Sequence, residues 1–244
     1  IYQLKTAIKK AGFYDVYEVA QGADVTTKKE AAEFQERMKH NEPFMTTSCC
    51  AGYNQLVKKH LNEIKPFVSD TLTPMAYIAQ IVKEKEPNSK LVFISPCVAK
   101  RVEVEENPNV DYLMNFEELG ALFVARKIEI MDCEEEAFDV ESSKQGRGFG
   151  ITAGVSQAVK DAAQNSDCVK PICINGLNKD TIKQLKKMAK DKKCDDGNLV
   201  EVMCCEGGCI GGNATINSVK IASKAINEFK TKSPDINGVE VCGD

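Results

Sequence analysis

Apolar positions recur at helical spacing along most of this chain, and Asn, Ser or Thr stands ahead of several of the periodic stretches. The pattern predicts helices over residues 2–11, 27–40, 52–63, 73–85, 115–126, 153–164, 178–191 and 213–230. Short runs typical of β-strands fall between them, at 15–20, 43–48, 90–96, 111–116, 170–176 and 198–204. Strands that alternate with helices predict an α/β fold with mostly parallel sheets flanked by helices.

The composition is that of an ordinary soluble globular protein. Apolar residues make up 43% and charged residues 28% of the 244 residues, and the mean hydropathy is -0.30. No apolar run approaches the roughly 20 residues that span a bilayer, so we expect no membrane insertion. The net charge of -4 and the lack of a long basic stripe argue against nucleic-acid binding.

The eleven cysteines are an odd number, and no secretory signal precedes them. This usage argues against a disulfide scaffold and predicts reduced thiols in the cytoplasm. The chain opens without Met and inside a helical pattern, so we expect it to be a piece of a longer polypeptide. The Gly-rich stretch 140–154 predicts a long loop, which either marks a boundary or covers a site.

Three segments share one layout, in which cysteine follows a predicted strand and precedes a turn or helix. They are "PFMTTSCC", "LVFISPC" and "LVEVMCCEGGC". Ligands of α/β proteins usually bind at the carboxyl edge of the sheet. The three strand ends are therefore predicted to converge on one site.

Cys205 and Cys209 form a C-x3-C pattern in a Gly-rich loop. Thiolates beside backbone N–H groups favour an iron-sulfur cluster, whereas a structural zinc site more typically shows C-x2-C spacing. The alternative is a pair of buried structural thiols. Lys100 follows Cys97 by three residues and would offset the negative charge of a thiolate-bound cluster, unless it is a surface lysine.

Together these segments resemble the FeFe hydrogenases. "TSCCAGY" is similar to the family pattern T-S-C-C-P-x-W, with Ala51 and Tyr53 in place of proline and tryptophan. "SPCVAKRVE" is similar to M-P-C-x-x-K-x-x-E, with Ser95 in place of methionine. "EVMCCEGGCIGG" follows the third family signature until Asn213 departs from it. "QGADVTTKKEAAEF" and "GITAGVSQAVKDA" extend the resemblance over most of the chain, as in a divergent subgroup.

The resemblance implies two α/β lobes with a metal cluster site in the cleft between them. Residues 1–244 would form one catalytic domain, incomplete at its N-terminus, whose two sub-lobes have an uncertain boundary. The cofactor would be an H-cluster, a 4Fe-4S cubane bridged by Cys209 to a two-iron subcluster with CO, cyanide and dithiolate ligands. The implied metal ligands are Cys50, Cys97, Cys205 and Cys209. Lys100 would bind a cyanide, and the pocket would be lined by Pro96, Ser95 and Met203.

The resemblance also implies a proton relay. It would run from Cys49 through Glu33 and Ser69 to an outer Glu30, with Cys49 a free thiol whose pKa is about 8.5. Glu30 and Glu33 lie on one face of the predicted helix. Two plainer interpretations stay open: Thr27 and Glu30 also fit a capping box, and Ser69 could cap the helix at 73–85.

The implied activity is the reversible interconversion of H2 with two protons and two electrons, catalysed by an oxidoreductase. Partners would be ferredoxin or another electron carrier, directly or through upstream iron-sulfur domains, together with maturation proteins. The alternatives are a sensory hydrogenase, or a hydrogenase-like iron-sulfur assembly protein, a class that generally lacks a cysteine at the position of Cys49. A zinc or thiol-only domain is the plainest rival. The remaining thiols are expected to be structural or on the surface: Cys133, Cys168, Cys173, Cys194, Cys204 and Cys242.

Overall fold

The computed structural model describes residues 1–238 and contains two separate parallel sheets. The first sheet has the order β1-β5-β4, from Met45–Thr46, Leu199–Met203 and Pro171–Asn175. The second pairs β2 (Val92–Ser95) with β3 (Tyr112–Asn115). The predicted α/β fold with parallel sheets and flanking helices is therefore confirmed. Cys242 lies outside the described residues.

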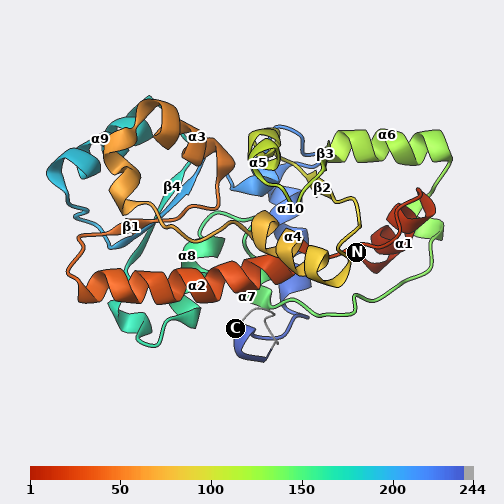
Figure 1. Cartoon of the computed structure of the whole chain (residues 1–244), viewed down its shortest axis with the longest axis horizontal. Helices are drawn as coiled ribbons and strands as arrows, with labels where there is room; N and C mark the ends of the chain where they lie inside the picture. The colour runs from red at the N-terminus through yellow and green to blue at the C-terminus, as the bar shows by residue number, and fades with distance from the viewer. Residues whose placement is uncertain (239–244) are drawn as a thin grey trace.

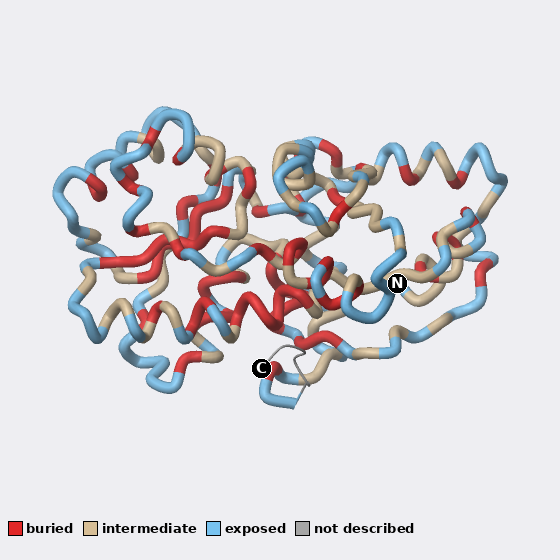
Figure 2. The backbone as a smooth tube through the Cα atoms, viewed as in Figure 1, coloured by how far each residue is buried: buried red, intermediate tan, exposed pale blue. Residues whose placement is uncertain are grey.

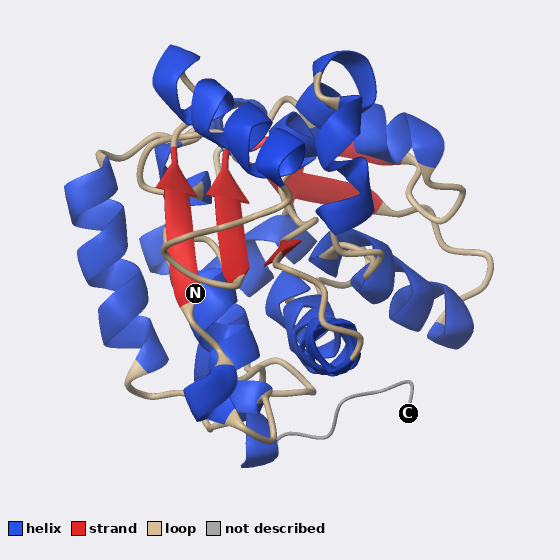
Figure 3. Cartoon of the chain, turned by 90° about the vertical axis from the view of Figure 1, so that its left-hand side faces the viewer, coloured by secondary structure: helices blue, strands red, loops and turns tan. Residues whose placement is uncertain are grey.

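Helices cover both faces of the three-stranded sheet (Figures 1 and 3). On one face lie α3 (Ala51–His60), the 3-10 helix η1 (Asn62–Phe67) and α9 (Lys179–Asp191), which pack on Val200 and Val202 of β5. On the other face, α2 (Val19–Lys39) and α8 (Gly154–Ala162) pack on Leu199. Successive side chains of a strand point to opposite faces, so β5 serves both cores. Figure 2 shows the buried segments concentrated along this sheet and α2.

The two-stranded sheet is also packed between helices. Phe93 of β2 meets α4 (Pro74–Lys85), whereas Ile94 meets α1 (Tyr2–Lys10) and α6 (Phe116–Arg126). Helix α5 (Lys100–Glu106) follows β2, and α10 (Val219–Lys230) is the last long helix described. Within residues 1–238, no helix is both long and apolar enough to cross a membrane.

The strand expected at 15–20 is absent from the described structure, and α2 begins at Val19 rather than near residue 27. A cavity of about 680 Å³ is lined, among other residues, by residues 13–19, by Leu91 and by Val92 to Ile94 of β2. No described strand pairs with residues 15–20, and the second sheet consists of β2 and β3 alone. None of the described cysteines lines this cavity, so it is not the expected metal site.

The two helix caps that stayed open as alternatives are not formed. Thr27 donates its hydroxyl to the Ala23 carbonyl, 2.8 Å away within the same helix, so it forms no capping box with Glu30. Helix α4 is capped by the Thr73 side chain, which accepts from the Ala76 N–H, and Ser69 is free for another role. The Gly-rich stretch 140–154 contains a short helix, α7 (Lys144–Arg147), held against α2 where Ser143 donates to Asp24.

Candidate metal centre

The carboxyl ends of three strands bring the predicted ligand cysteines into one region. Residues 47–50 follow β1, Cys97 follows β2, and Cys205 follows β5. Burial raises the pKa of the Cys209 thiol to about 12, and the thiols of Cys50, Cys97 and Cys205 add to that rise. Burial and the neighbouring Cys97 and Cys50 likewise raise the pKa of Cys205. Cys209 and Cys205 therefore each lie within electrostatic reach of the other three thiols.

The Cys209 side chain is both accessible to solvent and surrounded by enough protein to raise the pKa of its thiol. Part of its surface is accessible, yet its pKa is raised first by burial. A sulfur that solvent can reach while protein surrounds it on most sides accounts for both observations. Packed this way, the thiol is hard to ionise alone, and a bound cation such as iron would stabilise its thiolate form.

Cys50 stands at the N-terminal end of α3, where its sulfur accepts a hydrogen bond from the Cys204 N–H at 3.3 Å. This bond ties the start of α3 to the loop that follows β5. Cys204 itself packs against α3, since a Cβ on Gly52 would come within 2.9 Å of its sulfur. Cys204 thus contacts α3 beside the predicted ligands, while part of its surface is exposed.

The loop that carries Cys205 and Cys209 depends on glycine. Gly207 and Gly208 both have a φ of +87°, and a Cβ on Gly208 would lie 2.7 Å from the Gly150 carbonyl oxygen. The Ile210 N–H donates to the same carbonyl at 3.2 Å. The segment around Gly150 is held in turn by buried Glu201, whose carboxylate accepts from the Ala153 and Ser156 N–H groups at 2.8 Å.

Lys100 points toward the cysteines, as its predicted role requires. Its Nζ donates to the Cys49 carbonyl oxygen at 3.3 Å, and its charge acts to lower the pKa of Cys209. Glu103 accepts from Lys100 at 2.5 Å and from the Thr73 hydroxyl. The lysine is thus held inward by an anchored carboxylate rather than extended into solvent.

The three residues expected to line the pocket lie in the same region. Met203 is buried and packs in a cluster with Cys49 and Cys50. The Pro96 carbonyl accepts from the Ala214 N–H at 3.1 Å, which ties the turn after β2 to the loop after Cys209. Ser95 is buried, and its hydroxyl accepts from the Cys97 N–H at 3.2 Å, so it shapes the turn that carries Cys97.

The donor set fits an iron-sulfur cluster better than a single ion. Within the described residues, no three His, Cys, Asp or Glu side chains are arranged around one ion position, as a zinc site requires. The ligands of a cubane bind different irons and therefore stand farther apart than the ligands of one ion. Four soft thiols, a lysine and a loop that glycine keeps open match the needs of such a cluster.

Cys49 is not the unperturbed thiol that the sequence predicts. Burial raises its pKa well above the ordinary value, and the carboxylate of Glu30 adds to the rise. The side chain packs with Ala23, Phe149 and Met203. Cys49 is consequently a protonated thiol at neutral pH.

Glu30 is the buried carboxylate beside Cys49. Its side chain is 0% exposed, and neither of its oxygens has a hydrogen-bond partner of normal geometry among the described residues. Burial raises its pKa from 4.5 to about 8, with a contribution from Glu33, although the nearby Ser48 N–H and Ser69 hydroxyl act to lower it. An unpaired buried carboxylate is costly, so Glu30 is neutral at pH 7.

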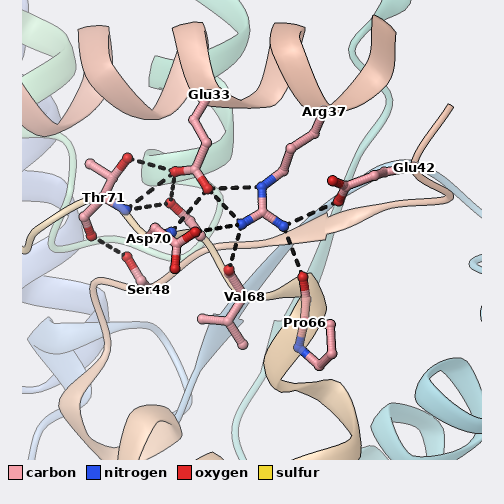
Figure 4. A network of polar contacts seen from close by, with 9 residues as sticks. Glu33, Arg37, Glu42, Ser48, Pro66, Val68, Asp70 and Thr71 are labelled. Atoms are coloured by element: carbon pink, nitrogen blue, oxygen red, sulfur yellow. Dashed lines mark hydrogen bonds and ion pairs between the residues drawn. The ribbon is translucent and has the colours of Figure 1, made fainter. Parts of the chain in front are cut away.

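Glu33 lies one turn away in a very different environment (Figure 4). It accepts from the Ser69 hydroxyl at 2.6 Å and from the Thr71 hydroxyl at 2.7 Å. Burial acts to raise its pKa, but hydrogen bonds from Ser69, Asp70 and Thr71 and the charge of Arg37 outweigh it, and the pKa of Glu33 is lowered. The predicted order of the two glutamates is therefore wrong: Glu30 is the inner carboxylate and Glu33 the outer one.

We did not predict from the sequence that Arg37 and Thr71 belong to the hydrogen-bond network around Glu33. Arg37 donates to Glu33 at 2.8 Å and pairs with Asp70, whose side chain is 96% exposed, so the network reaches solvent. The spacing of Glu33 and Arg37 at i and i+4 on one helix was the available signal. For Thr71 the sequence contained no such signal, because only the fold brings its loop beside α2.

Known proteins match this chain over most of its length. Residues 1–213 match the family described as "Iron only hydrogenase large subunit, C-terminal domain". "Iron hydrogenase 1" of Clostridium pasteurianum is 26% identical, and the match covers 86% of this chain and 44% of that protein. The "NADP-reducing hydrogenase subunit HndD" of Solidesulfovibrio fructosivorans is 27% identical with the same coverages. The chain thus spans less than half the length of these two relatives.

A relative of another kind is also found. The "Probable cytosolic Fe-S cluster assembly factor narfl" of Dictyostelium discoideum is 25% identical, over 93% of this chain and 62% of that protein. Among solved structures, an FeFe-hydrogenase HydA1 variant from Chlamydomonas reinhardtii has a TM-score of 0.78 at 21% identity, covering 98% of this chain and 81% of that one. The fold is shared with that structure, and the chain belongs to the family of the C-terminal domain of the iron-only hydrogenase large subunit.

Proposed function

We propose that this chain is the catalytic domain of an FeFe hydrogenase, which interconverts H2 with two protons and two electrons. The observation that carries the proposal is the pair formed by Cys49 and Glu30. Glu30 is fully buried and Cys49 partly buried beside the four-thiol group, and both hold a proton at neutral pH. A metal-binding scaffold has no need of a buried carboxylate without a hydrogen-bond partner, whereas proton chemistry does.

Cys50, Cys97, Cys205 and Cys209 would hold the cubane of an H-cluster, with Cys209 bridging to the two-iron subcluster. When bound, that cofactor supplies the metal at which H2 is formed or cleaved. Lys100, fixed by Glu103, would offer a cation to its anionic ligands. Met203, Pro96 and Ser95 would enclose the site.

Protons would pass along this chain's own side chains. Cys49 gives or takes a proton at its sulfur, and Glu30 holds the next one at its carboxyl group. Ser69 already donates to Glu33, so its oxygen is available to accept from Glu30. Glu33, ionised at neutral pH, then exchanges the proton with solvent near Arg37 and Asp70. The route thus runs from two groups that hold a proton, through a hydroxyl group, to a carboxylate that accepts one.

An iron-sulfur assembly protein and a sensory hydrogenase are the competing functions. The similarity to the assembly factor of Dictyostelium discoideum favours the former. Against it stand Cys49, which that class generally lacks, and the carboxylates that continue from it. A sensory hydrogenase would keep the same chemistry, and its product would act as a signal.

Partners and location follow from the proposed reaction. H2 and protons are the substrates, a ferredoxin or other electron carrier exchanges the electrons, and maturation proteins supply the cofactor. The cytoplasm is the proposed compartment, since all ten cysteines within residues 1–238 are free thiols.

Infrared spectroscopy of the anaerobically matured protein tests the proposal. Bands from CO and cyanide require the two-iron subcluster, and a cubane without such bands would favour the assembly function. Cys49→Ala should retain the metal and suppress turnover at least about a hundredfold, the usual worth of a positioned acid or base. Cys204→Ala is the matched control, because it removes a neighbouring thiol outside the route. Equal turnover in both variants would remove Cys49 from the route.

A further inference from the structure

One outer layer of the molecule carries a concentrated positive charge. The layer consists of α3, η1 and α9, which pack together on one face of the three-stranded sheet. Residues 51–67 and 179–191 contain eight lysines and three acidic residues, a formal charge of +5 in a chain of net charge -4. The opposite layer, α2 and α8, contains five basic and five acidic residues and is neutral.

These lysines face solvent. All eight are exposed, namely Lys58, Lys59, Lys65, Lys179, Lys183, Lys186, Lys187 and Lys190. Of these eight lysines, only Lys58 and Lys183 form ion pairs within the described residues, each with an acidic side chain. The amphipathic pattern of α9, whose Leu185 and Met188 are buried, requires polar residues on its outer face. It does not require that they share one sign, so the excess of cations calls for its own explanation.

The basic layer adjoins the cysteine centre. Helix α3 begins directly after Cys50. The Leu177 N–H, just before α9, donates to the Cys204 carbonyl at 3.0 Å, and the Asn175 side chain accepts from the Gly207 N–H at 2.7 Å. Both helices thus start at the loop that presents Cys205, beside the exposed side chain of Cys204. Electrons that enter or leave the four-thiol group on this side meet the basic layer first.

We propose that the layer formed by α3, η1 and α9 is the docking surface of an acidic electron-transfer protein. The inference rests on the proposed function, because oxidation of one H2 releases two protons and two electrons. Two molecules of a one-electron carrier would each accept one electron at this surface, and the protons would leave by the Glu33 side. Clustered charge of one sign attracts an oppositely charged partner and accelerates encounter, without requiring a deep groove.

Charge reversal on α9 tests the docking surface. Lys186→Glu with Lys190→Glu changes two exposed residues one turn apart that form no ion pair in the described structure. The matched control is Lys10→Glu with Arg126→Glu, an equal charge change on exposed residues of α1 and α6, at the other end of the molecule (Figure 1). The probe is a plant-type [2Fe-2S] ferredoxin of strongly negative charge.

The association rate with this ferredoxin is measured at low and high ionic strength. We expect the α9 variant to associate about tenfold more slowly at low salt, with the difference lost at high salt, and the control to stay within about twofold of wild type. Hydrogen oxidation with methyl viologen, a small cationic dye, should be unchanged in the α9 variant. Equal losses in the two variants would overturn the proposal, as would duplex DNA binding to this layer in place of ferredoxin.

The readouts separate the two proposals. Ferredoxin binding is measured without turnover, so it reports on the surface whether or not H2 is activated. If dye-linked activity is absent while binding depends on the α9 lysines, the proposed function fails and the docking surface stands. If dye-linked activity is present while ferredoxin binds the α9 variant as well as wild type, the docking surface fails alone.

Discussion

Replacing Glu30 by Gln offers the sharpest physical test of the buried relay. The wild-type carboxyl group is neutral in the folded protein up to a pKa of about 8, whereas its ordinary value is 4.5. Unfolding therefore releases its proton at any pH between these values. The unfolded state binds fewer protons than the folded state in that window, so wild-type stability falls as the pH rises. Gln has the same shape and no proton to lose.

The magnitude follows from the pKa. A rise from 4.5 to about 8 corresponds to about 5 kcal/mol, at about 1.4 kcal/mol for each pKa unit. This is an upper bound, because water entering the site softens the effect of burial. Below pH 4.5 the two proteins should differ by a constant amount. From pH 5 to 8 the stability of Glu30→Gln relative to wild type should rise by up to about 1.4 kcal/mol per pH unit.

Urea unfolding followed by circular dichroism, at several pH values between 4.5 and 8.5, measures this difference in preparations of equal iron content. Glu36→Gln is the control, since it removes an exposed carboxylate from the same helix, and its stability should stay parallel to that of wild type. The reasoning is refuted if the stabilities of Glu30→Gln and wild type also stay parallel across the range.

Three further substitutions test the centre. Cys209→Ala should abolish cluster assembly, and a full complement of iron in the purified variant would contradict its bridging role. Ser69→Ala removes a hydrogen bond to the Glu33 carboxylate, so it should raise the pKa of that group in a carbon-13 NMR titration; an unmoved pKa would exclude the contact. Gly208→Ala should destabilise the fold by about 1–3 kcal/mol in thermal unfolding, whereas Gly120→Ala, with nothing within 4 Å, should be neutral or stabilising.

Local patterns were sufficient for the elements that carry the metal centre. The runs around β1, β2 and β5 alternate with helical periodicity, and each ends in cysteine. Parallel strands place their carboxyl ends at one edge, so convergence of the thiols after β1 and β5 followed from the order of elements. Cys97 follows β2 of the other sheet, and only the packing of the two sheets brings it to the same region. The α/β fold and the likeness to iron-only hydrogenases could be predicted because they too depend on local sequence patterns.

The sequence could not predict which residues on one face of a helix are buried and which face solvent. A spacing of three residues places Glu30 and Glu33 on one side of α2, but it is silent on which of them faces Cys49 and which faces solvent. The residues that decide this belong to other segments: Ser69 and Thr71, which surround Glu33, lie more than thirty residues away. The predicted order was therefore wrong, and the raised pKa of Cys49 was missed, because burial is a property of the assembled structure.

By itself, then, the sequence determined the types of element, the thiols at their ends and the family. Packing decided the start of α2 and the missing strand at 15–20, because a strand needs a partner and no described strand pairs with these residues. It also gathered lysines that are scattered along the chain onto one layer, since α3, η1 and α9 come together only in space. Periodicity and turns are local, whereas burial, pairing and surface charge depend on contacts between distant residues.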